Sequence, residues 1–420
     1  MPQLTSEIAF DLHSGLTDFD VPELAELRMI GMAATLAIHI KGLASIPIEV
    51  LRGVCNIYWG IPSFALEKVL EILRDAGFVR LVGSPRVERV IPEIPIFETV
   101  YGTLDSYAQS EIHLNEHEET AISILRHLHD APRNRDTVFN DLGADKQVFA
   151  RTLQIGKRSG IISEHTARGR PILISPFYFT DNLDGLADLA ASHGATTIAE
   201  TLKRVKSAQG WPLSLVRKRK EIGHSSLSTD QLAVVEKLAA EGIIKPPTVT
   251  FGASAESFVF TPQPGPTRLN ASKKQIYERA MALISAVRKG QLMATRYPIR
   301  FPVTLLSRLR DRGYVAANSE AQLQYANLVT LLVGKLRPSG TGHIFELNKT
   351  PENLEALNLA IRLLRTGDLS GAEIDDDARL ALTKDERYIQ SLQASRDLRK
   401  APISIRSEEI EHEFQLLLNI

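Results

Sequence analysis

A short pattern recurs four times along the 420-residue chain and constrains its fold more than any other feature. In each copy an amphipathic helix ends at a glycine, and two strand-forming residues follow at once. The copies span 66–79 (LEKVLEILRDAGFV), 149–162 (FARTLQIGKRSGII), 231–244 (QLAVVEKLAAEGII) and 304–315 (TLLSRLRDRGYV). Glycine tolerates the left-handed backbone that closes a helix, so the β-branched or aromatic residues behind it can leave as a strand.

The spacing of the four glycines indicates a tandem array. Gly77, Gly160, Gly242 and Gly313 are 83, 82 and 71 residues apart. Apolar residues recur seven and four positions before each glycine, except that Gly156 stands where a larger residue is expected. These two positions are three apart and share one helix face, which we expect to be buried. The chain therefore contains four related units of about 80 residues.

Other elements predicted around each glycine complete a unit. Two helices precede the glycine-ended helix in the first and second copies, and a hairpin follows it. The third copy has a long loop within its hairpin, and the fourth is the least regular. The predicted fold is mainly α with small β-hairpins (α+β), built from tandem units with helical connectors.

The chain divides on this basis into five parts. We name them the first repeat (1–96), the second repeat (97–180), the third repeat (181–265, with a helical connector at its start), the fourth repeat (266–368) and the acidic linker and tail (369–420). Residues 371–420 hold eleven acids and seven bases. The end of the tail, 408–418, is amphipathic and could dock on a partner or on the body of the protein.

The order and spacing of these elements resemble the winged helix-turn-helix superfamily. The resemblance is best over 95–178, fair over 24–96 and loose over 225–345. In that superfamily the third helix of a unit enters the DNA major groove, and the wing contacts the backbone or the minor groove. For the second repeat this implies a reading helix over 145–158 and a wing, with the contact residues Lys146, Gln147, Arg151, Gln154, Lys157 and Arg158 on the helix and Arg168 and Arg170 on the wing.

Two of the other repeats depart from that pattern. The equivalent helix of the third repeat is acidic or apolar on most faces, so we expect it to pack against a neighbour. The helix of the first repeat mixes Glu67, Glu71 and Asp75 with Lys68 and Arg74. The resemblance therefore implies one best candidate for a DNA reader, the second repeat.

Basic residues are concentrated locally although the formal net charge is only -1. Residues 143–170 carry six bases and two acids, and residues 286–312 carry seven bases and one acid. Such patches are the electrostatic footprint of nucleic-acid binding. Beyond the second repeat, the further candidates are Arg217, Lys218, Arg219, Lys220, Arg308 and Arg310. The alternative is that these are solvated faces, or that the acidic N-terminus and tail neutralise them in cis.

The sequence offers no motif for catalysis. It lacks a phosphate-binding glycine loop, an H-E-x-x-H pair and a second cysteine. Cys55 lies in an apolar stretch and is predicted to be a buried small residue. His127 and His129 are two residues apart on a predicted helix and face different directions. We therefore expect no cofactor, no metal and no enzymatic activity.

These features predict a cytoplasmic protein that binds double-stranded DNA, as a regulator or an accessory factor in genome or mobile-element biology. The N-terminus does not have the pattern of a secretory signal, and the most apolar segment, 29–40, is too short to cross a bilayer. The alternative is a non-catalytic scaffold whose units dock partner proteins. A homodimer, and a protein partner that docks on the tail, are further open possibilities.

Overall fold

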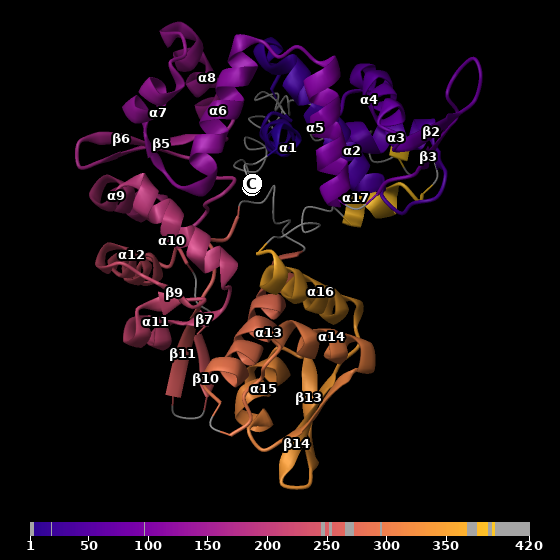
Figure 1. Cartoon of the computed structure of the whole chain (residues 1–420). Coiled ribbons are helices and arrows are strands. Elements are labelled where there is room, and N and C mark those ends of the chain that lie inside the picture. The colour runs from indigo at the N-terminus through magenta and orange to yellow at the C-terminus, as the bar shows by residue number, and fades with distance from the viewer. Residues whose placement is uncertain are drawn as a thin grey trace, which may run out of the picture. The chain divides into compact units, whose positions relative to one another are not determined.

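The computed structural model describes residues 4–17, 19–95, 97–244, 248–251, 254–264, 273–294, 296–367, 376–384 and 389–390. This part of the chain is mainly helical, with antiparallel sheets of two or three strands (Figure 1). The predicted α+β class is thus confirmed. Most of the predicted acidic linker and tail lies outside the described residues. Among the described helices, none combines the length and apolar character needed to cross a membrane.

The chain forms two compact units, one of residues 39–94 and 376–420 and the other of 1–38 and 95–375. The smaller unit contains most of the first repeat. Its elements are β1 (Ile46–Pro47), α3 (Ile48–Tyr58), α4 (Ser63–Asp75), β2 (Val79–Val82), β3 (Arg89–Pro92) and α17 (Asp376–Ala381). The strands pair in the order β1-β3-β2. On α4, Leu70 and Leu73 are at most 3% exposed, and Phe78 donates its N–H to the Leu73 carbonyl (2.8 Å) across the left-handed Gly77.

The larger unit begins with helices that enclose an apolar core. They are α1 (Thr5–Gly15), the 3-10 turn η1 (Pro22–Leu24), α2 (Ala25–Ile40, whose last two residues belong to the smaller unit) and α5 (Phe97–Glu111). Nearly every residue from 30 to 40 is buried, as expected for a helix that is apolar on all sides. Buried residues of α1 and of the start of α2 join the core of the second repeat.

The second repeat has the order helix, strand, helix, helix, strand, strand. Its elements after α5 are α6 (Glu116–Asp130), β4 (Arg133–Asn134), α7 (Arg135–Leu142), α8 (Lys146–Arg158), β5 (Ser163–Ala167) and β6 (Arg170–Ile174), and the sheet order is β4-β6-β5. The start of α6 carries a capping box between Asn115 and Glu118. A Cβ on Gly156 would lie 2.7 Å from a carbon of Ile162, and this contact explains the one glycine inside the repeated pattern.

After its connecting helix, the third repeat follows the order of the second, with one additional hairpin, β8–β9, between its second and third helices. Its elements are α9 (Leu183–His193), α10 (Ala195–Ser207), β7 (Trp211–Pro212), α11 (Leu213–Arg219), β8 (Glu221–Ile222), β9 (Ser225–Ser226), α12 (Thr229–Ala240), β10 (Thr248–Phe251) and β11 (Ser254–Val259), and β10-β11-β7 form its main sheet. Helix α9 contacts both β5 and β6. One continuous core consequently runs from Ile172 and Ile174 of the second repeat to Trp211 and Val259 of the third.

The fourth repeat has a different order, because its first strand follows the second helix. The elements are α13 (Lys274–Leu292), α14 (Pro302–Arg312), β12 (Tyr314–Asn318), α15 (Ala321–Thr330), β13 (Gly334–Ser339), β14 (Gly342–Leu347) and α16 (Pro351–Arg365). The sheet order β12-β14-β13 again places the first strand beside the last. Gly313 therefore ends α14 before β12 and does not precede the hairpin.

The counterpart of Gly77, Gly160 and Gly242 in the fourth repeat is Leu332, which has a left-handed backbone (φ 57°). Tyr325 and Leu328, seven and four residues earlier, are 4% and 1% exposed. Val333 donates its N–H to the Leu328 carbonyl (2.9 Å), as Phe78 does to Leu73. The helix-to-strand pattern predicted at 304–315 does form, since α14 ends at the left-handed Gly313 and β12 follows, but the turn that leads into the hairpin lies at 325–333, where a leucine takes the place of the glycine.

Candidate nucleic-acid interface

Helix α8 has one buried and one exposed face. The Asp145 carboxylate caps its start by accepting hydrogen bonds from the Gln147 (2.7 Å) and Val148 (3.2 Å) amides. Phe149 and Leu153 point into the core, and the helix packs on α6. The exposed face carries no acid; its residues are Lys146, Gln147, Ala150, Arg151, Gln154, Lys157 and Arg158. The predicted contact residues on α8 therefore share one accessible surface.

Two of the four cations on α8 are held by carboxylates that lie outside the helix. Arg151 forms an ion pair with Glu23 (2.6 Å). A backbone hydrogen bond and the Arg151 guanidinium hold the pKa of Glu23 below its usual value. Lys157 lies 2.5 Å from Glu164 of β5. Lys146 and Arg158 form no ion pair within the described part of the chain.

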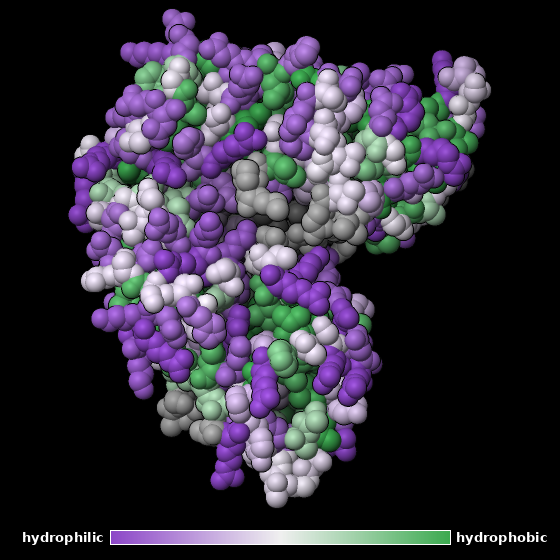
Figure 2. Space-filling view, in the orientation of Figure 1, coloured by the Kyte–Doolittle hydropathy of each residue, from purple (hydrophilic) through white to green (hydrophobic). Residues whose placement is uncertain are grey.

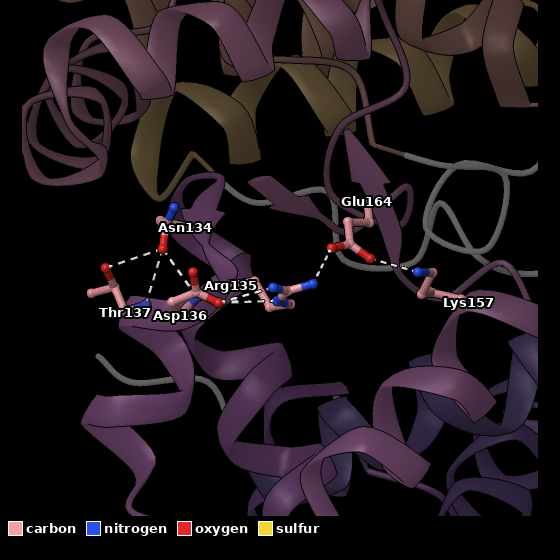
Figure 3. Close-up of polar contacts among 6 residues, drawn as sticks. All are labelled: Asn134, Arg135, Asp136, Thr137, Lys157 and Glu164. Atoms are coloured by element: carbon pink, nitrogen blue, oxygen red, sulfur yellow. Dashed lines mark hydrogen bonds and ion pairs between the residues drawn. The ribbon is translucent and has the colours of Figure 1, made fainter. Parts of the chain in front are cut away.

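The Glu164 carboxylate lies between two cations. Figure 3 shows one of its oxygens facing Lys157 and the other facing Arg135 at the start of α7, where the nitrogen–oxygen distance is 3.0 Å. The Glu164 side chain is 17% exposed, less than either partner. One partly buried carboxylate therefore fastens β5 to both α7 and α8.

The hairpin of the second repeat is fastened to α9. Its two-residue turn, Arg168 and Gly169, has positive φ at both positions (52° and 72°), which is the backbone of a type I′ turn. The Arg168 guanidinium donates two hydrogen bonds to Asp188 of α9 (2.8 and 3.2 Å), and this pairing lowers the pKa of the Asp188 carboxyl. His165 lies 2.7 Å from Asp184 of the same helix. Arg170 is exposed and makes no ion pair with any described residue.

A groove of about 580 Å³ runs between α7, α8 and β5. Apolar residues form its floor, namely Phe139, Phe149, Ala150 and Leu153. Charged and amide side chains line the remainder, namely Arg135, Asp136, Lys146, Gln154, Lys157, Arg158 and Glu164. In Figure 2, hydrophobic residues are visible between hydrophilic ones over the region where Figure 1 places α7 and α8. The sequence patterns did not identify Arg135, Asp136, Phe139 or Glu164 as site residues, because only the packing of α7 on its neighbours brings them to the groove.

The predicted basic run at 217–220 lies at the C-terminal end of α11. Arg217 pairs with Glu236 of α12 (3.2 Å), and Arg219 lies 3.5 Å from Glu221. Lys218 and Lys220 are exposed and form no ion pair within the described residues. Cations at the last turn of a helix interact favourably with its carbonyl end, so this run stabilises α11 whatever else it contacts.

The basic segment 286–312 separates into partly buried and exposed cations. Arg288 donates to the Gln209 carbonyl (3.0 Å) and lies 5.7 Å from the centre of the Trp211 ring, and burial lowers its pKa to about 10. Burial likewise lowers the pKa of Lys289 to about 8. On α14, Arg308 is exposed, whereas Arg310 contacts Asp311 (2.9 Å) and Asn358 (3.2 Å). The cation count along this segment therefore overstates the charge it offers at the surface.

The described residues hold no group of three His, Cys, Asp or Glu side chains that could bind a metal ion. Cys55 is completely buried, as predicted, and burial raises the pKa of its thiol. The sequence matches no model of a known protein family, and it matches no curated protein sequence. The chemistry of the α8 surface is therefore the basis for a functional proposal.

Proposed function

We propose that the second repeat is a winged-helix domain that binds double-stranded DNA through α8, and that the protein acts as a regulator or an accessory factor on DNA. The observation that carries this proposal is the exposed face of α8. It offers four cations and two carboxamides without a carboxylate among them. Lysine and arginine neutralise phosphates, and glutamine can pair with the edge of adenine.

The order of elements supports the same proposal. Helix α8 is the third helix after α6 and α7, and the hairpin β5–β6 follows it, with β4 paired to β6. In winged-helix proteins this is the position of the reading helix and the wing. The 13 residues of α8 give a rod of about 20 Å, and the B-DNA major groove, about 12 Å wide, admits such a helix.

The ion pairs on α8 leave their cations accessible to DNA. The Arg151 and Lys157 side chains are each 46% exposed, whereas their partners Glu23 and Glu164 are only 25% and 17% exposed. A phosphate can therefore approach both cations while each carboxylate stays in place, and the carboxylates reduce the positive charge at these two positions. Lys146 and Arg158 form no such pair within the described residues, so we expect them to make the first phosphate contacts.

A paired-variant titration tests this proposal. Fluorescence anisotropy with a labelled duplex at low salt would compare wild type, Lys146→Ala/Arg158→Ala and the control Lys274→Ala/Arg365→Ala, which removes the same charge from exposed positions on α13 and α16. We expect the α8 variant to bind about tenfold or more weakly and the control to bind like wild type. An equal loss of duplex affinity in both variants would mean that the net charge of the protein, and not the surface of α8, accounts for DNA binding.

A protein-docking scaffold is the second candidate, and the third repeat favours it. The exposed charges on α12 are Asp230, Glu236, Lys237 and Glu241 at its end, a surface that repels phosphate. Its apolar face packs on α9 and α10. Failure of the folded wild-type chain to bind any duplex at low salt would leave the scaffold as the remaining proposal.

A further inference from the structure

We propose that the groove between α7 and α8 binds an acidic amphipathic helix of a partner protein. The floor of the groove favours apolar side chains of the occupant, whereas its rim favours acidic side chains. This proposal goes beyond DNA binding and does not depend on it, because it concerns the apolar floor, which a duplex would leave uncovered.

The floor is apolar and partly open to solvent. Phe149 and Leu153 are 5% and 7% exposed, Phe139 is half-buried and Ala150 is exposed. The rings of Phe139 and Phe149 lie with centroids 5.1 Å apart. Because Ala150 has only a methyl group, it leaves space above the floor into which leucine or phenylalanine side chains of an occupant can reach. Moving such side chains out of water is favourable by roughly 25 cal/mol per Å² of apolar area.

The rim of the groove is cationic at both of its ends. Lys146 and Arg158 mark its two ends on α8 and are about 18 Å apart along the helix axis. Between them, Arg135 pairs with both Asp136 (3.1 Å) and Glu164 (3.0 Å), and Lys157 pairs with Glu164, so these four charges balance and the excess positive charge lies at the two ends. The lining residues together include four cations and two acids. An occupant with glutamate or aspartate beside its apolar face would complement both ends of the rim.

An amphipathic helix can contact the floor and the rim at the same time. Three turns of helix span about 16 Å, which matches the length of the rim. Apolar residues at positions i, i+3, i+4 and i+7 would lie on the floor, and the flanking acids would reach the cations, as in other helix-in-groove complexes. DNA presents phosphates and sugars, which pair with the rim but do not bury the floor. The proposed DNA-binding face of α8 and the groove share four residues, namely Lys146, Gln154, Lys157 and Arg158. Binding of the peptide and binding of the duplex should therefore be mutually exclusive.

Two synthetic peptides on the full chain test the proposal. The first is a fluorescein-labelled 16-residue sequence with leucines at i, i+3, i+4 and i+7 and glutamates on the flanks; the second has the same composition in scrambled order. We expect the amphipathic peptide to bind at least about tenfold more tightly than the scrambled one, because only the former places its leucines on one face. Equal affinity of the two peptides, or no binding of either, would overturn the proposal.

Ala150→Gln locates the binding site. The substitution puts a polar side chain over the floor, keeps the charge and the helix propensity, and changes an exposed position. We expect it to weaken the amphipathic peptide about tenfold, while the matched control Ala240→Gln on α12, also exposed, binds like wild type. Thermal unfolding monitored by circular dichroism would verify that both variants are folded. Unchanged peptide affinity in Ala150→Gln would contradict the assignment to this groove, and a duplex titration in parallel reports on DNA binding separately.

Discussion

The first and second repeats show how one arrangement of elements supports two different surfaces. Both have a short strand, two helices and a hairpin, and in both sheets the first strand pairs with the last. The third helix of the second repeat, α8, exposes only cations, amides and one alanine. The third helix of the first repeat, α4, exposes Phe64 at 87% together with acids and bases. Topology alone therefore does not determine which chemistry a repeat exposes on its third helix.

The hairpins of the two repeats differ in the same way. In the second repeat a two-residue turn is fastened to α9 by Arg168 and Asp188. In the first repeat the loop between β2 and β3 spans residues 83–88, and apart from Val87 each of them is exposed. Arg80 of β2 pairs with Glu93, beyond the end of β3 (3.4 Å). Packing between neighbouring repeats thus uses the hairpin of the second repeat, and the tip of the first is accessible within its own unit.

The largest expected effect concerns the phenylalanine near the start of each third helix. Phe149→Ala should lower the free energy of unfolding by about 3–5 kcal/mol, because it leaves a cavity in the core of the second repeat. Phe64→Ala should change it by less than about 0.5 kcal/mol, since the ring is exposed. Chemical denaturation of both variants measures the difference. A large loss for Phe64→Ala would mean that the exposed ring is covered by a contact within the protein.

Substitutions of the residues with a left-handed backbone should have smaller effects, which destabilise at the glycines and stabilise at Leu332. A Cβ on Gly77 or Gly160 meets no atom within 4 Å, so substitution by alanine strains only the backbone and should cost roughly 1–2 kcal/mol. Leu332→Gly should stabilise the fourth repeat by up to about 1 kcal/mol, because its side chain is 70% exposed and little burial is lost. Urea unfolding curves give both values. Destabilisation by Leu332→Gly would contradict its assignment as the counterpart of the glycines.

The smallest expected effect comes from freeing the hairpin of the second repeat. Asp188→Asn should raise duplex affinity about twofold to fivefold at low salt, since Arg168 would no longer be paired and a negative charge near the proposed interface is removed. Glu93→Gln, which frees Arg80 in the first repeat, should leave the affinity unchanged. Anisotropy titrations measure both. A larger gain from Glu93→Gln would move the DNA contact to the first repeat.

The sequence correctly predicted local features, which depend on residues close together in the chain. Gly77 and Gly160 mark real helix-to-strand turns, and Gly242 follows the end of α12 with the left-handed backbone that the pattern predicts. The turn into the hairpin of the fourth repeat was not predicted, because Leu332 occupies a backbone conformation that normally selects glycine and left no signal in the pattern. Gly313 also ends a helix before a strand, but that strand is the first of its sheet.

The surface of α8 was predicted only in part for a similar reason. Its exposed side chains follow from helical periodicity, which is local. The ion pair of Arg151 with Glu23 joins residues 128 apart, and that of Arg168 with Asp188 joins residues 20 apart. Neutralisation of the basic patches by the acidic N-terminus was one of the alternatives left open by the sequence, and Glu23 pairs with Arg151 at one position. The groove was not predicted, because Phe139 and Phe149 meet only through the packing of α7 and α8.

The salt dependence of duplex binding tests the central claim most directly. The logarithm of the binding constant for wild type should fall linearly with the logarithm of salt concentration, because each phosphate contact releases counterions. Removing two contacts in Lys146→Ala/Arg158→Ala should reduce the magnitude of that slope by about two. An unchanged slope in this variant, or no binding of the folded wild-type chain at low salt, would contradict the assignment of α8 as the DNA-binding helix.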